Sequence, residues 1–155
     1  MFHYSRQQII LHWVLVLLLV IQFLLGDSAT EAFDHWLESG TKAPGFGANL
    51  HVILGIVILA IALWRLVLHV TQPKAPHGDG ALDKLAVAVH WLLYVLLLAT
   101  PVLGMLAWFG GSESMGDTHA LAKSLLMILA LLHVAGALYH HFILKDDVMQ
   151  RMTGR

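Results

Sequence analysis

The sequence contains no cysteine and few charged residues. Charged residues make up 12% of its 155 positions, against about 25% in an ordinary soluble domain. Without cysteine the chain has no disulfide, no thiolate nucleophile, no thiolate-bound iron–sulfur cluster and no covalent haem attachment. The scarcity of charge excludes a disordered chain and an ordinary soluble enzyme. Since the formal net charge is −1, no basic surface attracts a polyanion, and we expect no nucleic-acid partner.

What the sequence has in excess is apolar residues, at 58%, and histidine, with 11 copies. Four apolar runs lie at about residues 9–26, 50–70, 85–109 and 120–144. Each has about 18–25 residues, enough to cross a hydrocarbon core of about 30 Å as a helix. The runs occupy most of the chain, and the longest connector spans residues 27–49. The sequence therefore predicts an all-α protein, an integral membrane four-helix bundle in contact with lipid, with residues 1–155 forming a single domain.

The basic residues predict the orientation of this bundle. Seven of the nine fall at one end, namely Arg6, Arg65, Lys74, Lys84, Lys145, Arg151 and Arg155. Because loops rich in lysine and arginine stay in the cytoplasm, both termini are predicted to be cytoplasmic. The opposite loops are acidic and carry Asp27, Glu31, Asp34, Glu38, Glu113 and Asp117. We expect the first run to be kept as a span, since it is longer than the apolar part of a usual signal peptide.

Histidines recur inside the apolar runs at depths that pair them. His119 and His133 are fourteen residues apart, which is about 21 Å along a helix and within about 40° of one face. His51 opens the second run at the outer end, so it is the histidine that can meet His119. His12 and His90 lie toward the inner ends of the first and third runs, so either can meet His133.

Two histidine pairs stacked across a helical bundle are the pattern of two bound haems, because neutral imidazole is an iron ligand. An iron with two histidine ligands has no vacant position, so it carries electrons and does not bind substrate. Zinc or copper would need three or four close ligands, and the runs supply no thiol or buried carboxylate. A histidine-lined transporter is the alternative without redox chemistry, but the first and third runs are too apolar between their ends to line a polar path.

Further motifs follow in order along the chain: Tyr4-Ser5-Arg6 before His12-Trp13, His51 at the start of the second run, Arg65 before a proline-rich loop, His90 eleven residues before Pro101, and His119 and His133 before His140-His141-Phe142. With these motifs, the sequence resembles the bacterial cytochrome b561 family of four-helix, di-haem membrane proteins over nearly its whole length. The resemblance implies that His12 and His133 bind an inner haem b and that His51 and His119 bind an outer one. It also implies the bacterial inner membrane as the location and a quinone as an exchangeable substrate.

Other residues gain roles within this resemblance. Arg65 is fourteen residues after His51, at the depth of the inner pair, where it would either neutralise a haem propionate or extend to the cytoplasmic surface. Tyr4 and Arg6 are expected to cap inner propionates or to form part of a quinone pocket. His140 and His141 lie about two turns beyond His133, either as solvated side chains or as groups that pass protons to a quinone.

The expected function is transmembrane electron transfer between a periplasmic redox protein and membrane quinone. One alternative is superoxide oxidation coupled to ubiquinone, an activity of some members of the family. The acidic outer loops oppose it, because they repel an anion. The other alternative is a haem-bearing membrane-anchor subunit of a dehydrogenase, which would act only in a complex.

Overall fold

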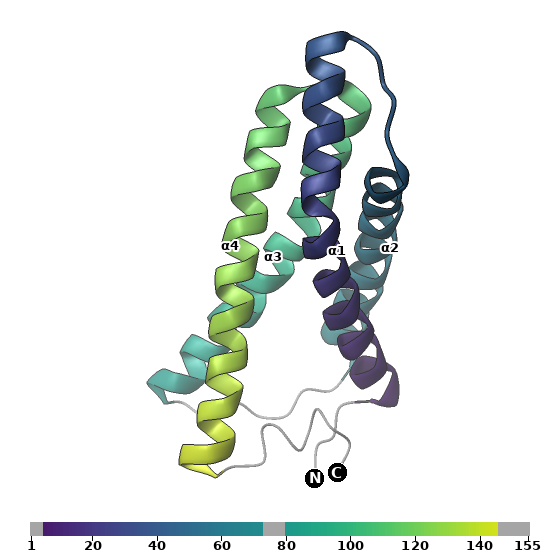
Figure 1. Cartoon of the computed structure of the whole chain (residues 1–155). Coiled ribbons are helices and arrows are strands. Elements are labelled where there is room, and N and C mark those ends of the chain that lie inside the picture. The colour runs from purple at the N-terminus through teal and green to yellow at the C-terminus, as the bar shows by residue number, and fades with distance from the viewer. Residues whose placement is uncertain (1–4, 73–79, 146–155) are drawn as a thin grey trace.

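The computed structural model describes residues 5–72 and 80–145, and it describes residues 81–83 through their backbone alone. Four long helices account for most of this part of the chain: α1 (Arg6–Ser39), α2 (Phe46–Thr71), α3 (Ala81–Gly110) and α4 (Glu113–Tyr139) (Figure 1). A short π-helical turn, His140–Leu144, follows α4 directly. The described residues include no strand, so the predicted all-α fold is confirmed.

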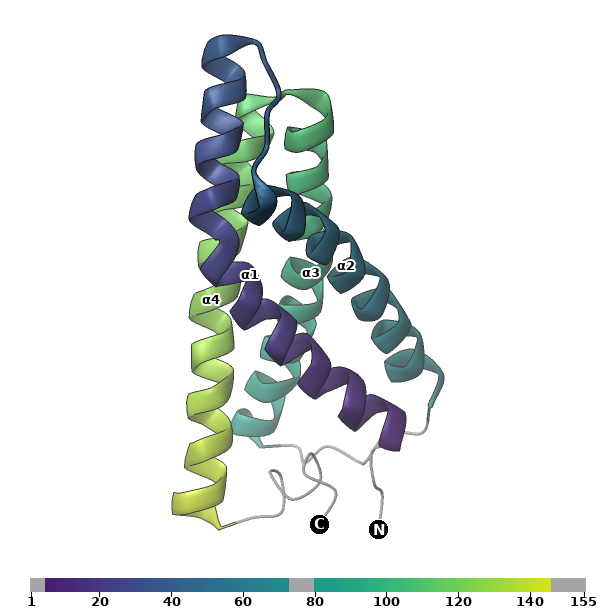
Figure 2. The same ribbon diagram turned by 45° about the vertical axis from the view of Figure 1, so that its right-hand side comes forward.

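The helices alternate in direction along the bundle. The start of α1, the end of α2, the start of α3 and the end of α4 lie at one end, and the α1–α2 connector and the α3–α4 turn lie at the other (Figures 1 and 2). We call these the inner and outer ends, following the predicted orientation. The assignment of the inner end to the cytoplasm stays a prediction from the basic residues.

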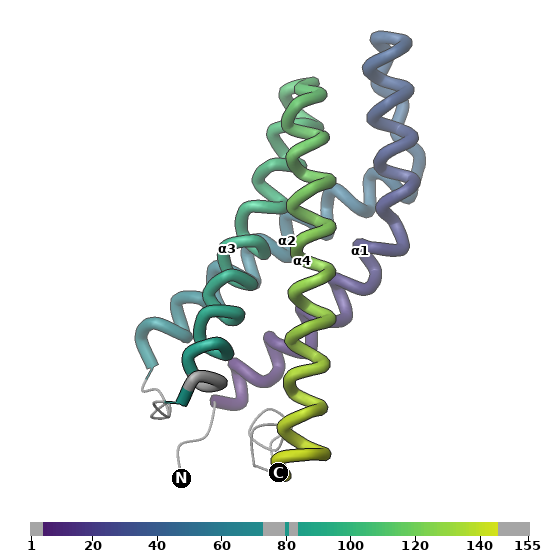
Figure 3. Tube along the Cα trace, turned by 90° about the vertical axis from the view of Figure 1, so that its left-hand side faces the viewer, coloured from purple at the N-terminus to yellow at the C-terminus, as the bar shows by residue number. Residues whose placement is uncertain are grey.

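The bundle is built from two helix pairs. α1 packs along α2 and α3 packs along α4, while α2 and α3 join the two pairs. Figure 3 shows the α3–α4 pair in front and the α1–α2 pair behind it. Where the pairs meet, a buried cluster takes side chains from all four helices, namely Leu15, Ile58, Ala62, Leu97 and Leu126. This cluster lies midway along the bundle and separates its inner and outer ends.

The outward surface of the helices is apolar. Many leucine, isoleucine, valine and tryptophan side chains are exposed, and all four helices are long and apolar enough to cross a membrane. A helix satisfies its own backbone hydrogen bonds, which lipid cannot do for it. The chain is therefore a multi-pass membrane protein.

α1 extends well beyond its apolar run. Residues 27–39, which the sequence left within the longest connector, continue the helix by about 20 Å past the run. No glycine or proline interrupts this stretch, and two of its aromatic rings pack against the α3–α4 turn: Phe33 contacts Gly116 and Trp36 contacts Gly111. The helix ends at Gly40, whose φ of 69° is left-handed and suits glycine. The outer half of α1 thus lies beside the start of α4.

The α1–α2 connector is fastened to the end of α3 by one lysine. The Nζ atom of Lys42 lies 4.2 Å from the centre of the Trp36 ring and 4.7 Å from that of the Trp108 ring. The same ammonium donates a hydrogen bond to the carbonyl oxygen of Trp108. Lys42 stays exposed, but its ammonium is held against these two rings, and the exposed acidic residues outnumber it at the outer end.

Candidate functional site

The structure brings together two pairs of histidines, one toward each end of the bundle. The ring centroids of His12 on α1 and His133 on α4 are 6.3 Å apart. Those of His51 on α2 and His119 on α4 are also 6.3 Å apart. All four side chains are half-buried. α4 therefore supplies one histidine to each pair, and the other member comes from the α1–α2 pair of helices.

The spacing of each pair suits two ligands on opposite faces of one metal ion. With metal–nitrogen bonds of about 2 Å, two such imidazoles place their ring centroids about 6 Å apart. The ring of His90 is only 4.9 Å from that of His133, which is too short for two ligands on opposite sides of one metal ion. His90 is also exposed, and its Nδ1 lies 2.6 Å from the carbonyl oxygen of Ala86 in its own helix. The geometry thus favours His12 over His90 as the partner of His133, a choice that depth in the sequence left open.

α3 fixes the orientation of His119. With its proton on Nδ1, His119 donates a hydrogen bond of 2.8 Å to the carbonyl oxygen of Thr100. Such a bond sets the tautomer and leaves Nε2 as the atom that can bind a metal. One turn further along α3, a Cβ atom on Gly104 would lie 3.0 Å from the His119 ring. The absence of a side chain at Gly104 therefore gives the imidazole its place against α3.

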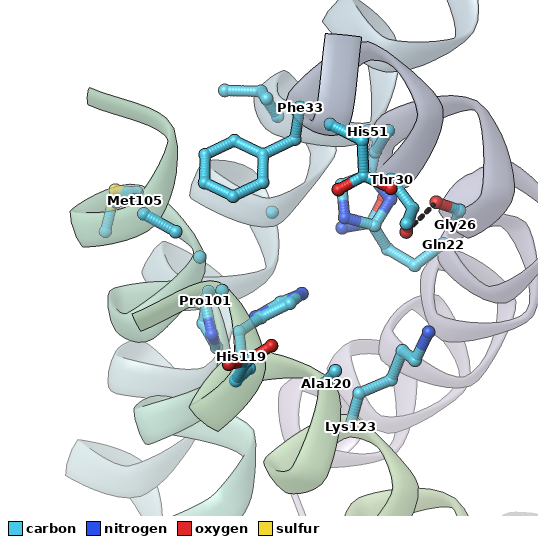
Figure 4. Close-up of a pocket in the computed structure, with 18 of the residues that line it drawn as sticks. Gln22, Gly26, Thr30, Phe33, His51, Pro101, Met105, His119, Ala120 and Lys123 are labelled. Carbon is cyan, nitrogen blue, oxygen red and sulfur yellow. Dashed lines mark hydrogen bonds between the residues drawn. The ribbon is translucent and has the colours of Figure 1, made fainter. Parts of the chain in front are cut away.

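A cavity of about 240 Å³ opens between His51 and His119 (Figure 4). All four helices line it, and its outer mouth carries the carboxylates of Asp34, Glu113 and Asp117. Two side-chain atoms beside it, Nδ1 of His51 and Oε1 of Gln22, are buried without a hydrogen-bond partner among the described residues. Buried polar atoms without partners are costly. Their presence beside a cavity between two imidazoles fits a site that holds a group with polar edges, such as haem.

Each histidine pair has one basic side chain beside it. The charge of Arg65 on α2 acts on both His12 and His133. The charge of Lys123 on α4 acts on both His51 and His119. The sequence predicts Arg65 at the depth of the inner pair, but it did not lead us to expect Lys123 beside the outer pair. The signal for Lys123 was nevertheless present, because a lysine inside an apolar run is rare.

The other residues singled out in the sequence lie toward the inner end. Arg6 is exposed in the first turn of α1, about 9 Å before His12 along the helix. Tyr4 lies outside the described residues. His140 and His141 are half-buried in the π-helical turn that follows α4.

An aromatic cluster that the sequence did not predict joins α2 and α3 near the inner end. The ring of His69 lies 5.6 Å from that of Trp91 and 5.3 Å from that of Tyr94. His69 lies on α2, whereas Trp91 and Tyr94 lie on α3, so the cluster exists only because these two helices pack together.

Comparison with known proteins places the chain among membrane cytochromes. The family model described as prokaryotic cytochrome b561 matches residues 3–155. A protein named cytochrome b562 from Cereibacter sphaeroides is 36% identical over 149 residues, which cover 96% of this chain and 94% of the relative. A probable superoxide oxidase CybB from Yersinia pestis is 27% identical over 176 residues, covering 96% and 94%. Cytochrome b561 homolog 1 of Escherichia coli (strain K12) is 27% identical over 176 residues, covering 98% and 97%.

Proposed function

Because the chain belongs to the prokaryotic cytochrome b561 family, and is thus a membrane cytochrome b of electron transfer, we propose that it binds two b-type haems and passes electrons between the outer surface and membrane quinone. The observation that carries this proposal is the pair of 6.3 Å histidine spacings, one toward each end of the bundle. When bound, the two haems supply one-electron carriers at two depths. The proposed location is the bacterial inner membrane.

The proposal assigns His12 and His133 to the inner haem and His51 and His119 to the outer haem. Two histidines at each haem iron would complete its coordination, so these residues would hold the metal and keep other ligands from it. Arg65 would bind a propionate of the inner haem through a charge-assisted hydrogen bond. Arg6 and Tyr4 remain candidates for an inner propionate or for a quinone headgroup.

The helices also provide the medium between the two sites. The ligands on α4 are separated by about 21 Å along the helix, a large part of a hydrocarbon core of about 30 Å. The buried cluster of Leu15, Ile58, Ala62, Leu97 and Leu126 lies between them. Apolar side chains offer water no hydrogen-bond partner in this region. Two carriers rather than one are therefore what allows electrons to cross the bundle.

The outer end suits a basic protein as electron partner. Asp34, Glu113 and Asp117 line the outer part of the cavity beside His51 and His119, and Lys42, though exposed, contacts the rings of Trp36 and Trp108 and does not line this cavity. Opposite charges speed the encounter of two proteins and orient them. We propose that a basic periplasmic redox protein exchanges electrons at this surface.

Superoxide oxidation is a second candidate function, because one relative is named a probable superoxide oxidase. The acidic mouth of the cavity opposes it, since superoxide is an anion and a negative surface slows its approach. Superoxide consumption by the purified protein with a ubiquinone analogue as acceptor tests this candidate. No consumption above that of haem-free protein would exclude it.

The proposed function is tested by counting haems. A dithionite-reduced minus oxidised spectrum, with the haem quantified as its pyridine haemochrome, should give two b-type haems per chain. A reduced ubiquinone analogue should then reduce both haems without dithionite. One haem per chain would refute one of the two histidine pairs, and none in folded protein would refute the assignment of the histidines to haem.

A further inference from the structure

Lys123 is a basic residue inside the apolar part of α4. It follows His119 by four residues, so it lies about 6 Å further along the helix on nearly the same face. Its side chain is half-buried and points into the cavity between α4 and α1 rather than toward the outer surface of α4 (Figure 4). Across that cavity, its Nζ atom lies 3.8 Å from the position that a Cβ atom on Gly26 would take. The ammonium thus reaches across the cavity to α1 at Gly26.

The protein supplies no partner for this charge in the part of the chain that the structure describes. Lys123 makes no hydrogen bond and no ion pair with any residue there. The carboxylates in the same cavity belong to its outer mouth, on Asp34, Glu113 and Asp117, and none of them is paired with Lys123. A charged side chain within a membrane span is costly unless an opposite charge or water meets it. Because Lys123 lies beside His51 and His119, the opposite charge is expected to belong to a group bound between these two histidines.

We propose that Lys123 is the charge partner of the outer haem: its ammonium binds a propionate of that haem and raises the reduction potential of that haem. This inference rests on the proposed binding of a haem by His51 and His119. An ammonium and a carboxylate form a strong, charge-assisted hydrogen bond where water is scarce. Reduction adds an electron to the haem, and a nearby positive charge stabilises the added negative charge.

The two basic residues then have parallel tasks. Arg65 acts on the inner pair and Lys123 on the outer pair. The guanidinium of Arg65 is always charged and binds carboxylates in a fixed fork, whereas the ammonium of Lys123 is a compact point charge. Lys123 is thus a positioning residue that makes the outer haem a better acceptor for electrons from an outer donor.

The test is a potentiometric titration of the full-length, haem-loaded protein and of three variants. Lys123→Gln removes the charge and Lys123→Arg keeps it. Lys42→Gln is the matched control, because it removes the other lysine of the outer end, which aromatic rings hold away from the cavity. In Lys123→Gln, one of two haems should become harder to reduce by about tenfold in its equilibrium constant, or about 59 mV for one electron. Lys123→Arg and Lys42→Gln should keep both potentials near those of the unmodified protein.

The outcomes separate this inference from the proposed function. Fewer than two haems in the unmodified protein would refute the proposed function before any variant is compared. If Lys123→Gln keeps two haems with unchanged potentials, the role of Lys123 is refuted and the proposed function is not. Water at the cavity mouth would then be what solvates the ammonium. If Lys123→Gln loses a haem during purification, retention by Lys123→Arg supports the charge partner, and loss in both variants overturns it.

Discussion

Gly104 provides a sharp test of how the outer histidine pair is built. A Cβ atom at this position would lie 3.0 Å from both Cε1 and Nδ1 of His119, whereas ordinary contacts of a Cβ atom are 3.4–4 Å. Gly104→Ala therefore forces the imidazole to recede by about 0.4 Å, more than the roughly 0.2 Å tolerated in metal–ligand distances. The hydrogen bond of 2.8 Å from His119 to Thr100 ties the ring to the same helix, α3, so the ring cannot recede freely without lengthening that bond.

The expected cost falls on the binding of the outer haem. Overpacking by one methyl group costs about 1–3 kcal/mol, which corresponds to about 5- to 150-fold in affinity. The helix itself gains about 1 kcal/mol from alanine in place of glycine, so the fold should not suffer. Gly104→Ala is thus expected to remain folded, to keep the inner haem and to lose the outer haem faster.

The assay is the release of haem in detergent, followed by Soret absorbance and by haemochrome quantification per chain. Gly110→Ala is the control, because it lies on the same helix and its added Cβ would meet nothing within 4 Å. Equal haem content and equal release rates in Gly104→Ala, Gly110→Ala and the unmodified protein would refute the reasoning, since the imidazole would then not depend on the gap at Gly104.

Three further predictions concern the ligands and the ends of α1. Replacing a proposed ligand by alanine should remove one haem and spare the other, as counted by pyridine haemochrome. This holds for each of His12, His133, His51 and His119. His90→Ala should keep both haems. If His90→Ala lost the inner haem while His12→Ala kept it, His90 and not His12 would be the partner of His133. Lys42→Gln should destabilise the connector by about 1–2 kcal/mol through three lost cation–π contacts. Faster proteolysis within residues 40–45 would show this, and unchanged cleavage would contradict the role of Lys42. Ser5 accepts a hydrogen bond from the backbone of Gln8, so Ser5→Ala should cost about 1 kcal/mol and lower the melting temperature, whereas an unchanged value would show that the cap contributes little.

Some features of the protein follow from single helices and were readable in the sequence. Long apolar runs predict membrane helices, because a helix alone satisfies its backbone in lipid. The fourteen residues between His119 and His133 place them on one stripe of α4 by helix geometry. The alternation of basic and acidic connectors predicted one orientation for the whole bundle. None of these inferences requires knowledge of how the helices contact one another.

Other features depend on where helices cross, which periodicity does not determine. The helical extension at residues 27–39 is stabilised by the packing of Phe33 and Trp36 on the α3–α4 turn, at glycines more than seventy residues away in the sequence. Polar residues such as Gln22 and Thr100 interrupt apolar runs, but only the assembled bundle shows that they border one cavity. All four helices line this cavity, so no single segment of the sequence reveals it.

The four spans and the depths of the histidines could be predicted from the sequence, because they are properties of one helix in lipid. Which neighbour each histidine faces depends on how the helices pack. His12 and His90 lie at similar depths, yet the first has its ring 6.3 Å from that of His133 and the second 4.9 Å. That difference comes from how α1 and α3 lie against α4. The direction of Lys123 has the same origin, since whether a face of α4 meets lipid or the outer cavity depends on which helices pack beside it.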